Sequence, residues 1–358
     1  MPLPPPSVEA WPLPRYLSVA TPHRVAYRVV GNPAGEPWLL LHGGPGGSGK
    51  PGMLRPLDLA KQWAIVPDQR GAGASTPTGR TVRNTTAALV ADLESLRQSL
   101  GIERWNVVAG SWGTVVALAY VARHPTHVGR MVLRGAFAAR RRELAGLLQP
   151  RGRVAQVAGS EVFWPRAPAD GVPAVLAALR PLLQAGTPSV PSLRVVRQWN
   201  LLEMACGLLG LRRSLRHATA NGEVLLARRI RRDVAGLQRQ MRRTKARRQQ
   251  PQNRAADKRL RTKFRVQAHY LTQRGFVRPG ALDRAVRTAA DAGVAIDWVH
   301  GRFDAVCPSA NSLAWAAMAP DGPGASRLHL TRSGHFGTEA DTLDVLRKIV
   351  RRAGKGLS

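Results

Sequence analysis

The sequence is poor in cysteine and has no long apolar runs. Only two cysteines, Cys206 and Cys307, occur among its 358 residues, too few for a disulfide framework or a cysteine-based zinc site. No run of 18 apolar residues is present, so we expect no membrane-spanning helix. Residues 1–15 lack a basic stretch followed by an apolar one, so they do not resemble a signal peptide. Together these absences predict a cytoplasmic protein.

Acidic side chains are also scarce. The chain has 22 Asp and Glu against 54 Lys and Arg, which gives a formal net charge of +32. A hydrophobic content of 44% with 9 tryptophans nevertheless predicts a folded core rather than a disordered chain. The strong positive charge leaves nucleic acid or another anionic surface open as a partner.

Much of the excess charge lies in one segment, residues 211–263. It carries 18 Lys and Arg against 3 acidic residues, which is +15 of the total +32. We favour a solvated or partly disordered segment, the usual state of a block of like charge. The alternatives are an arm that attracts an anionic surface or acidic peptides, and a degenerate segment in a damaged domain. Phe264 at its edge is the nearest aromatic residue, and base stacking needs aromatic side chains, so nucleic acid is a disfavoured partner.

Strand-like and helix-like segments alternate at both ends of the chain. The expected strands are residues 23–30, 37–41, 62–67, 105–109, 130–133, 294–300 and 327–330. The expected helices are residues 81–100, 115–123 and 341–352. Such alternation predicts an α/β fold whose parallel sheet is covered by helices on both faces. Residues 139–275 are rich in Leu, Ala and Arg with few strand signals, so we expect a helical insertion between core segments 1–138 and 276–358.

A serine flanked by small residues follows the expected strand 105–109. In the run VVAGSWGT at 107–114, Ala109, Gly110 and Gly113 surround Ser111. A nucleophilic serine on a tight strand-to-helix turn needs small neighbours, because the strand and the helix approach closely there. The backbone N–H of Trp112, at the start of the helix, is placed to stabilise an oxyanion. The run therefore predicts a serine nucleophile.

A glycine-rich loop follows the expected strand 37–41. In LHGGPGG at 41–47, the backbone N–H groups of Gly43 and Gly44 are placed to supply the second oxyanion position. We interpret His42 as a residue that holds this loop rather than as a catalytic base. No nucleotide or metal cofactor is indicated, because Pro51 stands where a phosphate-binding loop requires Ser or Thr after Lys50.

An aspartate and a histidine follow the last two expected strands. Asp304 lies in the loop after 294–300, and His335 lies in the loop after 327–330. The chain order of serine, acid and histidine is that of the α/β-hydrolase triad. Because the carboxyl ends of parallel strands meet at one edge of a sheet, we expect these two side chains to lie near Ser111.

Four short motifs of the sequence resemble those of the proline iminopeptidases. They are HGGPG at 42–46, DQRGAG at 68–73, GSWG at 110–113 and HGRFDAVCP at 300–308. The resemblance covers nearly the whole chain except the basic segment. It implies an α/β-hydrolase fold with 139–275 as a helical cap, and a cytoplasmic serine exopeptidase that removes N-terminal proline from peptides. It also implies that Ser111 is the nucleophile, His335 the general base and Asp304 the residue that orients the base.

Two cap glutamates hold the substrate's α-amino group in this family. The first matches Glu203, in the run WNLLE that starts at Trp199, but Gln267 occupies the second position, in RVQAHY. We assign these three residues to substrate binding, with Phe137 lining an apolar pocket for the pyrrolidine ring. Because an amide supplies no charge, we expect weaker aminopeptidase activity than a site with two glutamates would give.

Two other functions stay open at this point. A general esterase or amidase would use the same triad beneath an altered cap. A binding protein would instead hold an anionic polymer on segment 211–263. The presence of a nucleophile, a base, an acid and an oxyanion loop argues against a role in binding alone.

Overall fold

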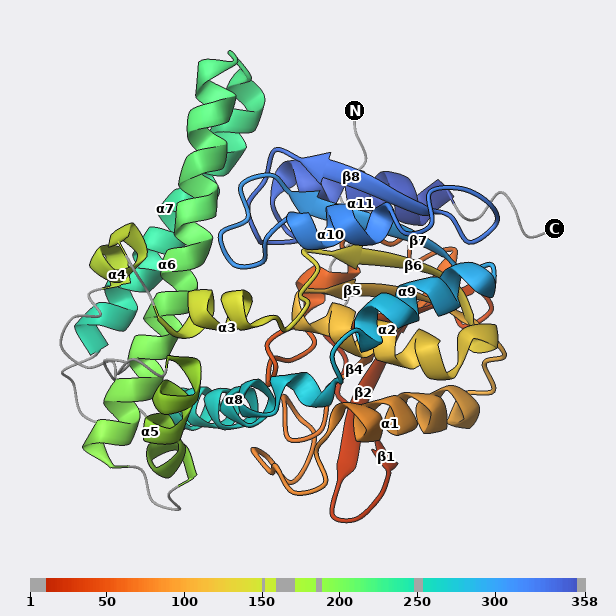
Figure 1. Ribbon diagram of the computed structural model, residues 1–358, viewed down its shortest axis with the longest axis horizontal. Coiled ribbons are helices and arrows are strands. Elements are labelled where there is room, and N and C mark those ends of the chain that lie inside the picture. Colours follow the sequence, from red (N-terminus) through yellow and green to blue (C-terminus); the bar gives the residue numbers. More distant parts are fainter. Residues whose placement is uncertain (1–10, 150–151, 159–170, 185–188, 248–253, 353–358) are drawn as a thin grey trace.

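The described part of the chain, residues 11–149, 152–158, 171–184, 189–247 and 254–352, is built around one mostly parallel sheet (Figure 1). In this computed structural model eight strands pair in the order β1-β2-β4-β3-β5-β6-β7-β8. They are β1 (Arg15–Ser18), β2 (Arg24–Gly31), β3 (Glu36–Leu41), β4 (Gln62–Pro67), β5 (Trp105–Gly110), β6 (Val128–Arg134), β7 (Ala295–Gly301) and β8 (Ser326–Thr331). The β1–β2 and β2–β4 pairs are antiparallel, and the others are parallel.

Alternate side chains of the strands pack into separate cores on the two faces of the sheet. In β3, Leu39 and Leu41 belong to one core, whereas Trp38 and Leu40 belong to the other. Helices α1 (Thr86–Ser99), α2 (Trp112–Arg123) and α9 (Ala281–Asp291) contribute to the first core, and α11 (Ala340–Arg352) contributes to the second. This two-sided cover confirms the α/β fold expected from the sequence.

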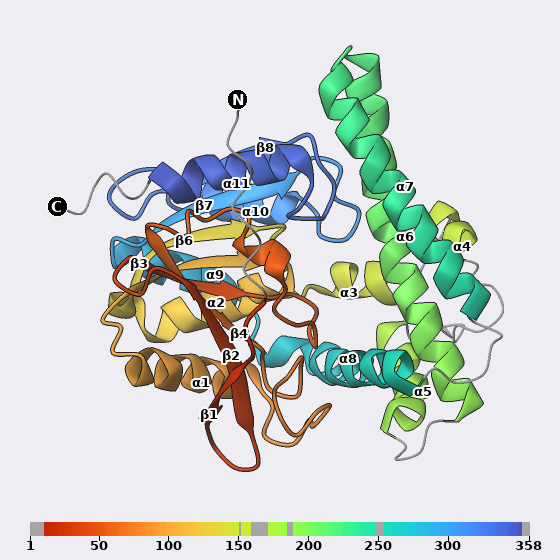
Figure 2. The same cartoon turned by 180° about the vertical axis from the view of Figure 1, so that it is seen from behind.

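Helices α3 to α8 form the cap and stand to one side of the sheet in both views (Figures 1 and 2). They are α3 (Arg141–Leu148), α4 (Gly152–Ala158), α5 (Val172–Gln184), α6 (Val190–Ala220), α7 (Val224–Arg247) and α8 (Arg254–Thr272). They leave the core after β6 and return to it before α9, within the interval 139–275. Helix α6 is the longest of these at 31 residues, and it forms a hairpin with α7 that stands out from the cap.

The basic segment is mostly helical where the structure describes it, and its residues 248–253 lie outside the described residues. Residues 211–247 and 254–263 belong to α6, α7 and α8, with a turn between the first two. On α7, Ala227, Ile230 and Met241 recur at helical spacing and pack on α6. The arginines of α7 lie on the opposite side and are solvated, as expected. The exposed arginines of α7 are Arg228, Arg229, Arg231, Arg232, Arg239, Arg242 and Arg243.

Most of the expected core elements are present, with one boundary that differs clearly. The helix expected over 81–100 begins at Thr86, because Thr85 caps it by accepting a hydrogen bond from the backbone N–H of Ala88 at 3.2 Å. Short helix α10 (Ala310–Ala316), together with β1 and α9, was not anticipated. Within the described ranges, we find no helix with the length and hydropathy needed to cross a bilayer.

Candidate active site

Four loops at the carboxyl edge of the sheet carry the residues expected to act in catalysis. Ser111 follows β5, and the glycine-rich loop that contains Gly43 follows β3. Asp304 follows β7 and His335 follows β8. Strands β3, β5, β6, β7 and β8 are parallel neighbours, so all four loops leave the same edge of the sheet.

Ser111 lies on a strained turn between β5 and α2. Its φ of 55° and ψ of −128° are unusual for a residue with a side chain, and its backbone N–H donates to the carbonyl of Arg134 at 2.9 Å. A Cβ at Gly110 would lie 2.3 Å from the Arg134 guanidinium, and a Cβ at Gly113 would lie 2.7 Å from the Leu41 carbonyl oxygen. Gly113 is therefore required by the close backbone at the end of β3, whereas a side chain at Gly110 would have to displace the Arg134 guanidinium.

Asp304 and His335 form a short hydrogen-bonded pair. The Nδ1 atom of His335 lies 2.7 Å from Asp304 Oδ2, while Oδ1 accepts from the backbone N–H groups of Val306 and Cys307 at 2.8 and 2.9 Å. Burial alone would raise the pKa of Asp304, but the charge and hydrogen bonds of His335 and His300 hold it well below its usual value. Asp304 is thus an acceptor for Nδ1–H, which leaves Nε2 of His335 free to accept a proton.

Ser111 and His335 line the same cavity. In the described structure no hydrogen bond joins Ser111 Oγ to the His335 ring. The cavity measures about 1180 Å³, and Gly43, Gly44 and Phe137 also line it. Hydrogen bonds of an active site are often loose without substrate and tighten in the reacting complex. The structure thus brings base and acid into contact and places the serine in the cavity that His335 lines.

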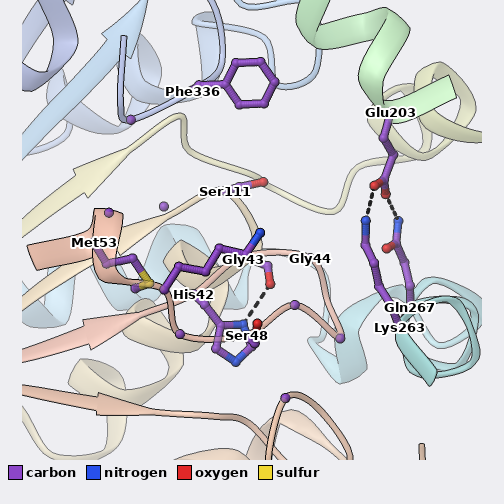
Figure 3. A pocket seen from close by; sticks show the side chains of 18 of the residues that line it. His42, Gly43, Gly44, Ser48, Met53, Ser111, Glu203, Lys263, Gln267 and Phe336 are labelled. Carbon is purple, nitrogen blue, oxygen red and sulfur yellow. Dashed lines mark hydrogen bonds and ion pairs between the residues drawn. The ribbon is translucent and has the colours of Figure 1, made fainter. Parts of the chain in front are cut away.

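The glycine-rich loop packs directly against the nucleophile (Figure 3). A Cβ at Gly43 would lie 3.2 Å from Ser111 Cβ and 3.7 Å from Ser111 Oγ, so only a glycine backbone fits without displacing the serine. Trp112 is the first residue of α2, and its backbone N–H is therefore one of the helix donors without an intrahelical acceptor. Gly44, with a φ of 125°, continues the loop along the cavity wall.

His42 holds this loop in place. Its Nε2 accepts from the backbone N–H of Gln69 at 3.0 Å, so its Nδ1 carries the proton and donates to the Gly43 carbonyl at 2.9 Å. Burial lowers the pKa of His42, which keeps the ring neutral. Gln69 also accepts from the indole of Trp112 at 3.0 Å. Gln69 of the DQRGAG run thus connects the glycine-rich loop with the start of α2, the two segments predicted to supply the oxyanion donors. The sequence alone did not indicate this role.

Glu339 holds the loop that carries His335, and the sequence did not single it out. Its carboxylate accepts from the backbone N–H groups of Gly334 and Phe336 at 2.7 and 2.8 Å, on the two sides of the histidine. Burial, helped by the negative charges of Asp304 and Asp233, raises the pKa of Glu339 from 4.5 to about 7 despite the two N–H donors.

This raised pKa predicts a pH-dependent contribution to stability. The folded protein binds the Glu339 proton more tightly than the unfolded chain does, so the stabilisation is complete below about pH 4.5 and is lost as pH rises through about 7. We expect the difference in unfolding free energy between the native protein and Glu339→Gln to fall by about 3 kcal/mol over that window. Denaturant titrations at several pH values measure it, with the exposed Glu103→Gln as a control. A difference that is constant with pH would contradict this assignment.

Three of the four residues expected to bind substrate line the cavity, two of them from the cap. Glu203 on α6 and Gln267 on α8 line the cavity, and Phe137, just after β6, lines it as well. Trp199 does not: its side chain is fully buried and stacks on Phe264 with ring centroids 4.7 Å apart. The assignment of Trp199 to substrate binding is therefore corrected to packing between α6 and α8.

One cluster elsewhere has the residue types of a metal site. The ligand atoms of Glu94, His124 and His127 lie within 4.8 Å of one another. Glu94, however, is already paired with Arg97 at 2.6 Å and accepts from the Tyr120 hydroxyl at 2.8 Å. These contacts lower the pKa of Glu94 to about 2. An arginine on the same carboxylate opposes a cation there, so we assign the cluster to the packing of α1 on α2.

The strand order, the strained serine turn and the Asp304–His335 pair define an α/β hydrolase. The family model of the alpha/beta hydrolase fold matches residues 36–180. A proline iminopeptidase of Xylella fastidiosa strain Temecula1 is 33% identical over 343 residues, which are 92% of this chain and 93% of that protein. The proline iminopeptidase of Xanthomonas citri is 47% identical over 133 residues, 37% of this chain and 42% of that protein. The chain belongs to the proline iminopeptidase family.

Solved structures of more distant relatives show the same fold. A 2-hydroxy-6-oxo-6-phenylhexa-2,4-dienoate hydrolase from a Rhodococcus strain superposes with a TM-score of 0.56 at 15% identity, over 96% of this chain and 99% of that chain. An esterase from another Rhodococcus strain superposes with a TM-score of 0.53 at 16% identity, over 96% and 98% of the two chains. At these identities the likeness concerns the fold alone.

Proposed function

We propose that this protein releases N-terminal proline from peptides by way of an acyl-enzyme on Ser111. The observation that carries the proposal is one cavity that Ser111 and His335 line from the core and Glu203 and Gln267 line from the cap. Asp304 lies behind His335 and is hydrogen-bonded to it. Membership of the proline iminopeptidase family supports the choice of substrate. The test is Ser111-dependent hydrolysis of a proline arylamide, an experiment developed in the Discussion.

In the proposed reaction His335 acts first as a base toward Ser111 and then as an acid toward the leaving amine. Nε2 of His335 takes the proton of the Ser111 hydroxyl as Oγ attacks the carbonyl carbon of the proline residue. The oxyanion is held by the backbone N–H of Trp112 and by that of Gly43 or Gly44. Nε2–H then protonates the departing amine as the C–N bond breaks. Water, deprotonated by the same nitrogen, attacks the acyl-enzyme, and Nε2–H then returns the proton to Ser111 Oγ as the acyl–oxygen bond breaks and free proline leaves.

Asp304 has two functions in this scheme. It keeps the proton of neutral His335 on Nδ1, and it stabilises the imidazolium that forms when Nε2 is protonated. The low pKa of Asp304 keeps the carboxylate charged over the working pH range, so it serves both functions without itself taking the proton.

The proposed substrate pocket combines an apolar wall with hydrogen-bond acceptors. Phe137, 4% exposed, offers an apolar surface to the pyrrolidine ring. The secondary ammonium of the terminal proline would donate to the Glu203 carboxylate and to the Gln267 carbonyl oxygen. Gln267 Nε2 donates to Glu203 Oε1 at 2.7 Å, which fixes the orientation of the amide and turns its Oε1 away from the carboxylate.

Introducing a second carboxylate should strengthen recognition of the ammonium. We expect Gln267→Glu to raise kcat/KM for a proline arylamide about tenfold, because a charge-assisted hydrogen bond is stronger than a neutral one by roughly 1.5 kcal/mol. Steady-state kinetics measure the effect. Gln240→Glu adds the same charge to another part of the cavity wall and is the matched control. If Gln267→Glu brings no gain, Gln267 is not an acceptor for the substrate amine.

A second candidate function has one observation in its favour. The Glu203 carboxylate is already paired with the ammonium of Lys263. The positive charge of Lys263 therefore offsets the negative charge that Glu203 would offer to a substrate amine. A general esterase or amidase with the same triad would need no charged recognition site. Hydrolysis of a p-nitrophenyl ester without any hydrolysis of a proline arylamide would favour it over the exopeptidase.

We infer further that the protein acts in a reducing compartment, the cytoplasm. Both cysteines, Cys206 and Cys307, are free and buried in the structure. Burial raises the pKa of Cys206 to about 11, so the thiol stays protonated and unreactive.

A further inference from the structure

The cap carries an ion pair at the point where the substrate amine is expected (Figure 3). The ammonium of Lys263 on α8 contacts Glu203 Oε2 on α6, while Gln267 Nε2 donates to Oε1 of the same carboxylate. Both carboxylate oxygens of Glu203 therefore already have partners from this chain. All three side chains line the cavity that also contains Ser111.

The rest of the cap fixes this arrangement. Asp257 on α8 binds Arg197 on α6 through two hydrogen bonds of 2.9 and 2.7 Å, and both side chains are buried. This second pair joins the same two helices, so Glu203 and Lys263 are held within reach of each other. The Lys263 ammonium also lies 4.6 Å from the centroid of the Phe264 ring, which favours the same position.

Gln267 Oε1 is the acceptor that this arrangement leaves unused. Gln267 is 1% exposed, and its Oε1 is buried and has no hydrogen-bond partner in the described structure. A buried acceptor without a partner is costly, and a donor from a bound ligand would satisfy it. Lys263 and Glu203 are 25% and 27% exposed, so a ligand entering the cavity can reach their ion pair.

We propose that Lys263 is a specificity-determining residue that competes with the substrate's amino group for Glu203. This inference rests on the proposed function, in which Glu203 receives that amino group. A free N-terminal proline must displace the Lys263 ammonium or share the carboxylate with it, whereas a proline with a blocked, uncharged nitrogen has no such competition. Lys263 therefore lowers the preference of the enzyme for free over blocked amino termini.

The inference is tested by removing the charge of Lys263 and keeping most of its length. We expect Lys263→Met to raise kcat/KM for a free proline arylamide about fivefold, the range of a partly exposed ion pair, through a lower KM. The kcat/KM of this variant for an N-acetylproline arylamide should stay within twofold of that of the native protein. Lys263→Arg keeps the charge and should behave like the native protein. Lys258→Met removes a neighbouring lysine of the cavity wall and should leave the ratio of free to blocked substrate unchanged.

A binding experiment separates this inference from the proposed reaction. In a Ser111→Ala background, calorimetry compares the affinities of L-prolinamide and N-acetyl-L-prolinamide with and without Lys263→Met. Tighter binding of L-prolinamide alone supports the inference even if no proline substrate is cleaved. The inference would be overturned if L-prolinamide bound with the same affinity with and without Lys263→Met, or if it bound more weakly to the Lys263→Met variant. A far-UV circular dichroism spectrum matching that of the parent, recorded for each variant, excludes misfolding as the cause.

Discussion

Replacing Ser111 by alanine is expected to abolish hydrolysis of a proline arylamide, with kcat falling on the order of 10⁴- to 10⁶-fold. Without Oγ no acyl-enzyme forms, and only oxyanion stabilisation and substrate binding remain to assist attack by water. Ser111 is partly exposed and lines the cavity, and alanine removes only its hydroxyl group. The substitution should therefore leave the thermal unfolding midpoint within a few degrees of that of the native protein.

A serine of the same cavity provides the control for this variant. Ser48 belongs to the glycine-rich loop and lines the cavity, but it follows no strand-to-helix turn. Ser48→Ala should retain kcat within a small factor. If Ser111→Ala retains most of its activity, or if Ser48→Ala loses as much, the assignment of the nucleophile is wrong.

Replacing Asp304 by asparagine is expected to lower kcat about 10⁴-fold. The amide can donate a hydrogen bond to Nδ1 of His335, which favours the tautomer with the proton on Nε2. Nε2 then cannot accept the Ser111 proton, and the imidazolium loses its stabilising charge. The loss of kcat should diminish little at high pH. The His335 ring is already neutral there, and raising the pH does not move its proton from Nε2 to Nδ1.

The fold contains a second aspartate–histidine pair that serves as a matched control. Asp297 Oδ1 and His329 Nε2 are 2.7 Å apart, the same length as the Asp304–His335 contact, and they also join β7 to β8. His329 does not line the active-site cavity, whereas His335 does. Asp297→Asn should leave kcat unchanged apart from effects on stability. Comparable losses in the two variants would mean that such pairs act only in holding the strands together.

Much of the core follows from local signals in the sequence. The strands from β2 to β8 occur near their expected positions because each is a short apolar run bounded by turn residues. The predicted catalytic residues stand out in the sequence because the motifs that hold them contain glycines, and Gly43 and Gly110 make close contacts in the structure. Strand β1 escaped notice because three of its four residues are exposed, which leaves no apolar pattern to detect.

The cap was harder to predict, because charge concealed its apolar pattern. On α7 the apolar residues Ala227, Ile230 and Met241 recur at helical spacing, but the arginines between them suggested disorder. Lys263 lies four residues before Gln267, a spacing that places both side chains on one helix face. That signal is present in the sequence. It is informative only once the segment is known to be helical and Glu203 is known to lie opposite.

Glu339 illustrates a role that no local pattern reveals. Its carboxylate binds the backbone on both sides of His335, and this contact depends on how the loop after β8 turns back toward α11. The Gln69 contacts to His42 and Trp112 are of the same kind, because they join three loops that are far apart in sequence. Whether local or long-range, such contacts depend on the path of the loop backbone, which no spacing rule in the sequence displays.

The net charge of +32 has two structural meanings. Part of it is the exposed arginine face of α7, which points to solvent and takes no part in the cavity's recognition site. A single basic residue, Lys263, bears directly on the proposed chemistry, because its ammonium contacts the carboxylate expected to receive the substrate amine. Total charge is therefore a poor guide to function here, whereas the position of one lysine is informative.

The most direct test of the proposed function is a comparison of arylamides of free proline, free alanine and blocked proline, together with a p-nitrophenyl ester. We predict that kcat/KM is highest for free proline, with a preference over blocked proline that grows in Lys263→Met, and that Ser111→Ala cleaves none of them measurably. Ester hydrolysis that depends on Ser111, with no cleavage of any proline arylamide, would contradict the assignment of this chain as an exopeptidase for N-terminal proline.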